Sequence, residues 1–166
     1  MRGFYLSTLI FFAIAFVGCS IYSPYGAATS GGSTFSIKYF ETVHPLVSAS
    51  TSITISEALI DRVQRQSTLQ LVDDGGDLTF EGKVVGWQVQ PINVQGNETA
   101  GANRITITVD VVYTNTKDDK LSFQRKFNRF YDLPSSQDIH SNTDFVVEEI
   151  ADLLSQDIFN ASLGNW

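Results

Sequence analysis

The sequence predicts an α+β fold, a two-layer sandwich with two amphipathic helices packed on one face of a mixed, mainly antiparallel sheet. Two observations carry this prediction. Several segments alternate apolar and polar residues, which is typical of antiparallel strands with one solvated face. Two other segments repeat apolar residues every three or four positions, which is typical of helices that bury one stripe. The predicted element order is β-α-β-β-β-β-α, because the helices need the apolar face of the sheet as a partner.

The chain begins with a pattern typical of a bacterial lipoprotein. A short basic head precedes residues 4–17, an almost wholly apolar run of 14 residues. Such a run fits a signal peptide and is short for a spanning helix. Residues 16–19 read Phe-Val-Gly-Cys and resemble the lipobox, in which a small residue precedes an acylated cysteine. We predict a signal peptide over residues 1–18 and lipidation of Cys19; an ordinary signal peptide or an uncleaved anchor is the alternative.

The use of cysteine agrees with a lipid anchor. Cys19 is the only cysteine, so no disulfide framework is available to explain it. Acylation with several chains gives stable attachment to a membrane. Residues 20–34 carry no charge and are rich in Ser, Gly and Ala, so we expect 19–34 to form an acylated flexible tether. Neither an aspartate nor an acidic cluster follows the cysteine at once, which predicts the periplasmic side of the outer membrane.

The remaining chain is acidic and of a size for one domain, which we place at residues 35–166. Removal of residues 1–18 takes away one basic residue and no acidic one, so the net charge changes from −7 to −8. An acidic domain does not attract polyanions through its overall charge. We therefore exclude nucleic acid as a main partner.

The first half of this domain predicts a strand, a helix and a second strand. Residues 35–40 alternate aromatic or aliphatic side chains with polar ones, as a half-buried strand does. Thr54, with a glutamate three residues later, predicts a capping box that starts a helix ending near Gln66. Residues 69–73 predict a second strand, which stops at the Asp-Gly-Gly-Asp turn of 74–77.

The second half predicts three longer strands and a terminal helix. In residues 78–89 the apolar phase slips by one position, which predicts a β-bulge near Gly86. Residues 105–113 alternate strictly between apolar and polar side chains, and residues 121–127 form the expected return strand. From 143 to 160 the apolar residues recur at helical steps, with acidic residues on the other side.

Residue types that carry catalysis or hold metals do not converge in this chain. It has two histidines and no second cysteine, and it contains no zinc-binding His spacing, nucleophile elbow or phosphate-binding glycine loop. A solvated acidic face explains the carboxylates without a catalytic pair. We predict no enzymatic activity, no catalytic residue, no metal and no cofactor.

Basic residues concentrate in one predicted strand and beside it. Lys120, Arg125, Lys126 and Arg129 lie within ten residues and alternate with aromatic side chains, and Arg104 in the neighbouring strand is a candidate to join them. Along a strand, Arg125 and Arg129 share one face, and Lys120 and Lys126 point the other way. Positive charge beside aromatic surface suits a lipid-linked phosphate or sugar phosphate. We predict glycolipid binding here; an edge strand protected by charge is the simpler alternative.

Several segments along the chain, taken together, resemble a known family. They are Gly18-Cys19-Ser20-Ile21-Tyr22-Ser23, Leu69-Gln70-Leu71-Val72, residues 76–82, residues 103–109, residues 123–127, Asp157-Ile158-Phe159-Asn160 and Asn165-Trp166. The chain resembles the LptE family, lipoproteins of the lipopolysaccharide-assembly translocon, in the form found in Bacteroidetes. The resemblance covers nearly all of the chain after the signal peptide, and none of its segments is a chemical signature by itself.

The resemblance implies both a fold and a function. Members of the family have helices packed on a mixed sheet, as the sequence pattern also predicts. They complex with and plug the large outer-membrane β-barrel LptD, and assist the assembly and delivery of lipopolysaccharide to the outer leaflet. Two alternatives share the anchor and the fold: an accessory lipoprotein of another envelope machine, for secretion or barrel assembly, and a periplasmic lipid-carrier module with an apolar cavity.

Overall fold

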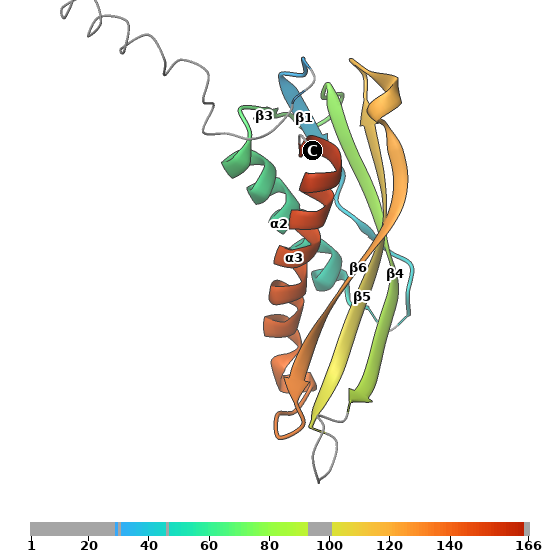
Figure 1. The fold of residues 1–166 in the computed structure, drawn as a ribbon, viewed down its shortest axis with the longest axis vertical. Helices are drawn as coiled ribbons and strands as arrows, with labels where there is room; N and C mark the ends of the chain where they lie inside the picture. Colours follow the sequence, from blue (N-terminus) through green and yellow to red (C-terminus); the bar gives the residue numbers. More distant parts are fainter. Residues whose placement is uncertain (1–28, 30, 46, 93–100, 165–166) are drawn as a thin grey trace, which may run out of the picture.

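The computed structural model describes residues 29, 31–45, 47–92 and 101–164 (Figure 1). The predicted signal peptide, Cys19 and most of the predicted tether lie outside these residues. Six strands, two α-helices and two short 3-10 turns follow one another along the described chain. They are β1 (Thr34–Ile37), β2 (Glu41–Thr42), α2 (Ala49–Gln66), β3 (Gln70–Leu71), β4 (Leu78–Ile92), β5 (Ala102–Asn115), η1 (Asp119–Leu121), β6 (Phe123–Pro134), η2 (His140–Asn142) and α3 (Thr143–Leu163).

The six strands form one mixed, open sheet with both helices on the same side of it (Figure 1). The order is β3-β1-β4-β5-β6, and β2 pairs with β4 beyond the end of β1. The long strands β4, β5 and β6 pair antiparallel, whereas the short strands β1, β2 and β3 pair parallel. The predicted α+β class, the mixed sheet and the one-sided helices are therefore confirmed. The two-residue strand β2 is an addition to the predicted order.

Strict alternation in β5 divides the sheet into a buried and an open face. The odd positions from Ile105 to Tyr113 are buried beneath the helices, and Val112 on the opposite face is exposed. The register between β4 and β5 shifts between Val84 and Gly86, which confirms the predicted bulge. Because side chains alternate along a strand, one extra residue reverses which side chains of β4 face the helices beyond that point.

Helix α2 begins earlier than the predicted capping box at Thr54, and that prediction is wrong. The N-cap is Ser48, whose hydroxyl accepts a hydrogen bond from the Thr51 backbone N–H at 3.4 Å. The Thr54 hydroxyl donates instead to the Ser50 carbonyl inside the helix, at 3.1 Å. Serine and threonine hydroxyls bonded in this way are tolerated within a helix, so a Ser- and Thr-rich segment conceals its true start. The predicted end at Gln66 is confirmed.

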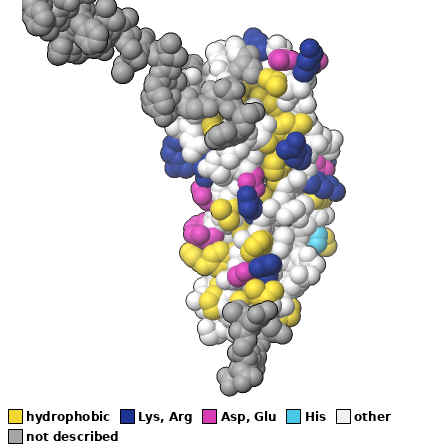
Figure 2. Space-filling view, viewed as in Figure 1, with side chains coloured by type: hydrophobic (Ala, Val, Ile, Leu, Met, Phe, Trp, Pro, Cys, Tyr) yellow, Lys and Arg dark blue, Asp and Glu magenta, His cyan; other side chains and the backbone are white. Residues whose placement is uncertain are grey.

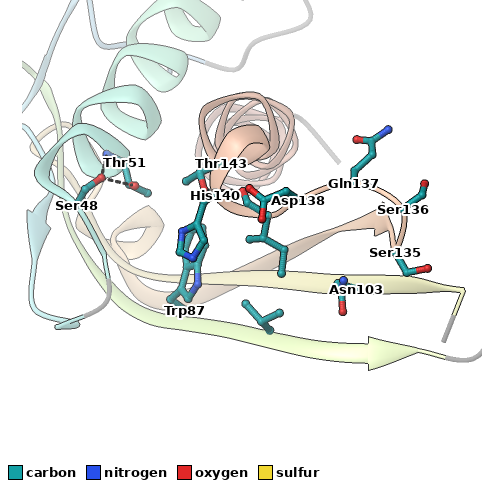
Figure 3. Close-up of a pocket in the computed structure, with 12 residues that line it drawn as sticks. Ser48, Thr51, Trp87, Asn103, Ser135, Ser136, Gln137, Asp138, His140 and Thr143 are labelled. Atoms are coloured by element: carbon teal, nitrogen blue, oxygen red, sulfur yellow. Dashed lines mark hydrogen bonds between the residues drawn. The ribbon is translucent and has the colours of Figure 1, made fainter. Parts of the chain in front are cut away.

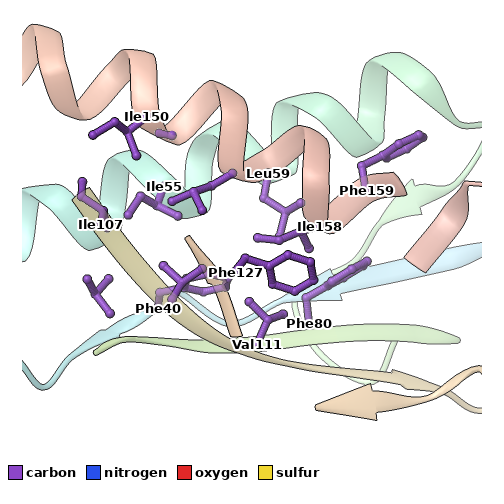
Figure 4. Close-up of a cluster of buried hydrophobic side chains, with 14 of the residues drawn as sticks. Phe40, Ile55, Leu59, Phe80, Ile107, Val111, Phe127, Ile150, Ile158 and Phe159 are labelled. Carbon is purple, nitrogen blue, oxygen red and sulfur yellow. The ribbon is translucent and has the colours of Figure 1, made fainter. Parts of the chain in front are cut away.

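The apolar stripes of the two helices meet the sheet in one continuous core (Figure 4). Ile55 and Leu59 of α2 and Ile150 and Ile158 of α3 are fully buried. Each such side chain contributes roughly 1.5–3 kcal/mol relative to exposure. The apolar steps of α3 also include Leu153, but it lies on the exposed side of the helix.

One charged side chain is buried where the two helices meet. Arg62 of α2 donates from Nε to the Ser155 hydroxyl at 2.8 Å and from Nη1 to the Gln156 side-chain oxygen at 2.5 Å. Its Nη2 donates to the backbone carbonyl of Asp152 at 3.1 Å and to the carboxylate of Asp152 at 2.5 Å. These four hydrogen bonds connect one side chain of α2 to successive turns of α3, so they fix the position of one helix along the other.

Candidate functional site

The strand that carries the predicted basic site, β6, is the last strand of the sheet. It pairs only with β5 along the sheet order, and helix α3 lies beside it. Its register places Arg125 opposite Val111 and Arg129 opposite Ile107, so both arginines point to the helix-covered side. Lys126 lies opposite Asp110, and Arg104 of β5 lies opposite Asp132.

The five predicted basic residues therefore lie on different sides of the sheet. Lys126 and Arg104 are on the open face, because Arg104 and Asp110, the partner of Lys126, are even positions of β5 that alternate with its buried odd positions. Arg125 and Arg129 are on the helix-covered side of the edge strand. Lys120 belongs to the turn η1, which leads into β6. Four of the five residues lie on β6 or in the turn before it, Arg104 lies on the neighbouring strand β5, and together they do not form a single compact patch.

Arg104 is engaged by Asp132, an aspartate that no sequence pattern singles out. Its Nε and Nη2 donate to the two carboxylate oxygens of Asp132 at 2.7 and 2.8 Å. Its guanidinium also stacks on Phe130, 3.8 Å from the ring centroid. The hydrogen bonds raise the pKa of Arg104 and lower the pKa of the Asp132 carboxyl. A bidentate pair of this kind needs the register of β5 on β6, which sequence alone does not supply.

Arg129 makes the second such pair and connects the edge strand to α3. It donates from Nε and Nη2 to the two carboxylate oxygens of Asp157, each at 2.5 Å. This contact raises the pKa of the arginine, chiefly through the side-chain hydrogen bond. A ligand phosphate would have to replace Asp157 to take both of these donors.

The remaining three predicted residues differ from every other lysine and arginine of the described chain, because they form no ion pair there. Between residues 31 and 164, ten lysines and arginines occur, and seven of them form ion pairs at N–O distances of up to 3.9 Å. The other three are Lys120, Arg125 and Lys126, which have no carboxylate of the described residues within 4.0 Å. All three are exposed and lie at the beginning of β6 or just before it.

An aromatic row leads from the core to this cluster. Phe80, Tyr113 and Phe123 lie side by side on β4, β5 and β6, with ring centroids 5.0 and 5.3 Å apart. Phe127 continues the row along β6 at 6.3 Å from Phe123. The Arg125 guanidinium lies 5.4 Å from the centroid of Phe123 and 6.0 Å from that of Phe127. This cation therefore has an aromatic surface beneath it and no carboxylate beside it.

The arrangement suits contact with an anion attached to an apolar body. An exposed guanidinium can bind a phosphate bidentately, and the rings beneath it offer apolar surface to the attached chain or sugar. Every other lysine and arginine of the described residues has a carboxylate partner, and Figure 2 shows basic and acidic side chains next to one another down the face in view. The start of β6 is therefore where the described chain can best accept an anion, despite its net negative charge.

Two further properties of the described residues bear on function. No helix among the described residues (29, 31–45, 47–92 and 101–164) is long and apolar enough to cross a membrane. Within the same part of the chain, no three His, Cys, Asp or Glu side chains gather where a metal ion could be held.

Comparison with known proteins gives a consistent picture. The fold is similar to a hypothetical protein of Chlamydia trachomatis (TM-score 0.53, 12% identity, covering 76% of this chain and 93% of that one). It is also similar to a protein of Xanthomonas campestris (TM-score 0.53, 8% identity, 82% and 86% covered). A third similar fold is an uncharacterized lipoprotein B of Nitrosomonas europaea (TM-score 0.50, 9% identity, 86% and 88% covered). No curated protein sequence matches the chain.

The decisive match is to a family model. The LptE model, described as lipopolysaccharide-assembly, matches residues 33–162. This range includes every strand and almost the whole of α3. Since the match covers well over half of the sequence, the chain belongs to the LptE family of lipopolysaccharide-assembly proteins.

Proposed function

We propose that the protein is an outer-membrane lipoprotein that complexes with and plugs an LptD-type β-barrel, and assists lipopolysaccharide assembly and delivery to the outer leaflet. The observation that carries this proposal is the family match over residues 33–162. In this function the protein makes and breaks no bond. It supplies a rigid wedge, and its anchor keeps the local concentration of that wedge high beside the barrel.

The anchor in this proposal is lipid on Cys19, on the periplasmic side of the outer membrane. The apolar run, the lipobox-like sequence before Cys19 and the absence of any other cysteine support it. Labelling with a palmitate analogue is expected to mark the native protein, and Cys19→Ser should abolish the label and release the protein from membranes. A labelled Cys19→Ser variant would contradict this assignment.

We assign the glycolipid contact to the basic surface of β6, where Lys120, Arg125 and Lys126 have no carboxylate partner among the described residues. A lipopolysaccharide phosphate would meet these three cations first. Arg104 on the open face and Arg129 on the helix-covered side lie farther along the strand pair, and each would have to exchange Asp132 or Asp157 for the ligand. The contact is therefore proposed to begin near η1 and to continue along β6.

Charge reversal tests this assignment. Arg125→Glu combined with Lys126→Glu is expected to weaken lipopolysaccharide binding at least tenfold, because charge-assisted hydrogen bonds to phosphate are lost. The control is Arg65→Glu, which reverses the charge of an exposed arginine on α2. Binding is measured by surface plasmon resonance on immobilised lipopolysaccharide at two salt concentrations. An equal loss in the control, or none in the double variant, would contradict the assignment.

The cellular role is tested by depletion. Removing the protein from a strain with a regulated copy should reduce lipopolysaccharide on the cell surface, while its synthesis continues. Expression of the wild-type chain should restore surface delivery. Normal surface lipopolysaccharide after complete depletion would contradict the proposed function.

A further inference from the structure

A groove opens at the end of the molecule opposite the start of β6 (Figure 3). Its volume is about 900 Å³, within the size range of small-ligand sites. The far ends of β4 and β5 form its floor, and the N-terminal ends of α2 and α3 with the segment before α3 form its walls. Three separate parts of the sequence therefore converge on this space.

The floor of the groove is aromatic because of the bulge in β4. Beyond the bulge, Trp87 pairs with Ile107 and Val89 pairs with Ile105, so both side chains face the helix side. Without the extra residue near Gly86, their neighbours would face this side and Trp87 would point to the open face. Trp87 is half-buried at the border of the core and lines the groove, and His140 lines the same space (Figure 3).

The walls are polar but carry little charge. Asn103, Thr51 and Thr143 supply an amide and two hydroxyls and His140 an imidazole, and none of the described residues that line the groove is a lysine or arginine. Asp138 contributes a carboxylate whose Oδ2 accepts hydrogen bonds from the Ser141 N–H and hydroxyl at 2.8 and 2.9 Å. These contacts lower the pKa of Asp138, so it remains an acceptor at neutral pH. Figure 3 shows Asp138 and Thr143 on the wall above Trp87.

This combination selects one class of ligand. A phosphate is held best where lysine or arginine stands in the walls, and an acyl chain would cover the amide, hydroxyl and carboxylate groups of the walls without giving them partners. A sugar ring has a face of C–H groups that packs on an indole, and hydroxyls that need amide, hydroxyl and carboxylate partners around the rim. The groove supplies both kinds of surface.

We propose that the groove binds a neutral saccharide, with one sugar ring stacked on Trp87 and its hydroxyls hydrogen-bonded to Asn103 and Asp138. The chemistry fits the oligosaccharide of lipopolysaccharide and also a free polysaccharide; the first source rests on the proposed function. Nine residues of β6 (126–134), roughly 30 Å of strand, separate Arg125 from the groove at Ser135, so this site is distinct from the cations at the start of β6.

The tryptophan itself reports occupancy. The chain has two tryptophans, Trp87 and Trp166, so a Trp166→Phe variant leaves Trp87 as the only indole. The full acylated chain is used in a detergent without a sugar headgroup. The probes are dephosphorylated lipopolysaccharide core oligosaccharide, maltohexaose, myristate and inorganic phosphate. We expect a saturable change in Trp87 emission with a saccharide and none with myristate or phosphate.

Two variants and calorimetry complete the test. Asn103→Ala should weaken saccharide binding about tenfold, as expected for one lost hydrogen bond with an unpaired ligand group. The matched control Asn128→Ala removes an exposed amide from the open face and should change nothing. Calorimetry on the chain with both tryptophans should give the same affinities, so the result does not depend on the Trp166 substitution.

Each outcome decides the proposal. Binding of the core oligosaccharide supports the glycolipid as the source, and binding of maltohexaose alone supports a free polysaccharide. Binding of only myristate or phosphate, no saccharide binding at about 10 mM, or equal losses in both asparagine variants would overturn it. Asn103→Ala should still co-purify with the barrel, so failure of this site leaves the proposed function standing.

Discussion

The buried Arg62 gives the sharpest test of how the two helices are held together. Its side chain is 9% exposed, whereas that of its partner Asp152 is 68% exposed. Of the acceptors of Arg62, Ser155 Oγ is fully buried but also donates to the Asp152 carbonyl at 2.8 Å. Loss of the arginine therefore leaves its fully buried acceptor, Ser155, still hydrogen-bonded, while loss of the carboxylate leaves a buried cation without its counter-charge.

This asymmetry sets the expected magnitudes. Arg62→Met keeps the aliphatic stem and removes the charge, so its effect on the free energy of unfolding should stay within about 1 kcal/mol. Asp152→Asn keeps the shape and removes only the counter-charge, and should cost about 1–2 kcal/mol, less than for a fully buried pair because Asp152 is exposed. The double variant should match Arg62→Met, since the carboxylate then has nothing to neutralise.

Urea unfolding followed by circular dichroism at pH 7 measures all three differences. The chain with Arg65→Met is the matched control, because Arg65 is exposed on the same helix and should be near neutral. If Asp152→Asn proves neutral while Arg62→Met costs more than about 3 kcal/mol, the hydrogen bonds and not the charge compensation hold the helices.

Two other predictions concern packing and acid stability. A Cβ at Gly82 would lie 2.6 Å from the Phe40 ring, so Gly82→Ala should destabilise the fold by about 1–3 kcal/mol in urea unfolding, and Phe40→Leu should partly relieve it. Hydrogen bonds from backbone N–H groups, and next from Lys117, hold the pKa of Asp77 well below its usual value. A depressed carboxyl pKa contributes stability above the unfolded pKa of about 4, which is lost as the pH falls towards the folded value. Asp77→Asn should therefore flatten the decline of stability between about pH 4 and pH 2, while Asp74→Asn should not; equal slopes in both would contradict this.

Much of the fold could be predicted because periodicity survives in this sequence. The alternation in residues 105–113 and the phase slip near Gly86 correspond directly to β5 and the bulge. The start of α2 is harder to predict, because a threonine hydroxyl can either cap a helix or bond to a carbonyl inside it. Thr54 matches a capping pattern, but its hydroxyl donates to the Ser50 carbonyl within the helix. The strand β2 has two residues and pairs parallel with β4, and two residues are too few to show the alternation that predicts a strand.

The candidate site was predicted only in part, because ion pairs depend on register and packing. The cluster of cations is visible in the sequence, but the engagement of Arg104 by Asp132 requires the pairing of β5 with β6. The pair between Arg129 and Asp157 requires α3 to lie beside the edge strand. The apolar alternation in residues 78–89 indicates only a strand face for Trp87, and the groove is created by the helix N-termini that meet above it.

The central claim is that this protein acts with a large β-barrel in the outer membrane. It is tested most directly by affinity purification of the tagged, acylated chain from solubilised outer membranes, with partners identified and quantified by mass spectrometry. We predict stoichiometric recovery of an LptD-type barrel, unchanged in the Arg65→Glu control. Recovery of the lipoprotein alone, or with the barrel of another envelope machine, would contradict the proposed function.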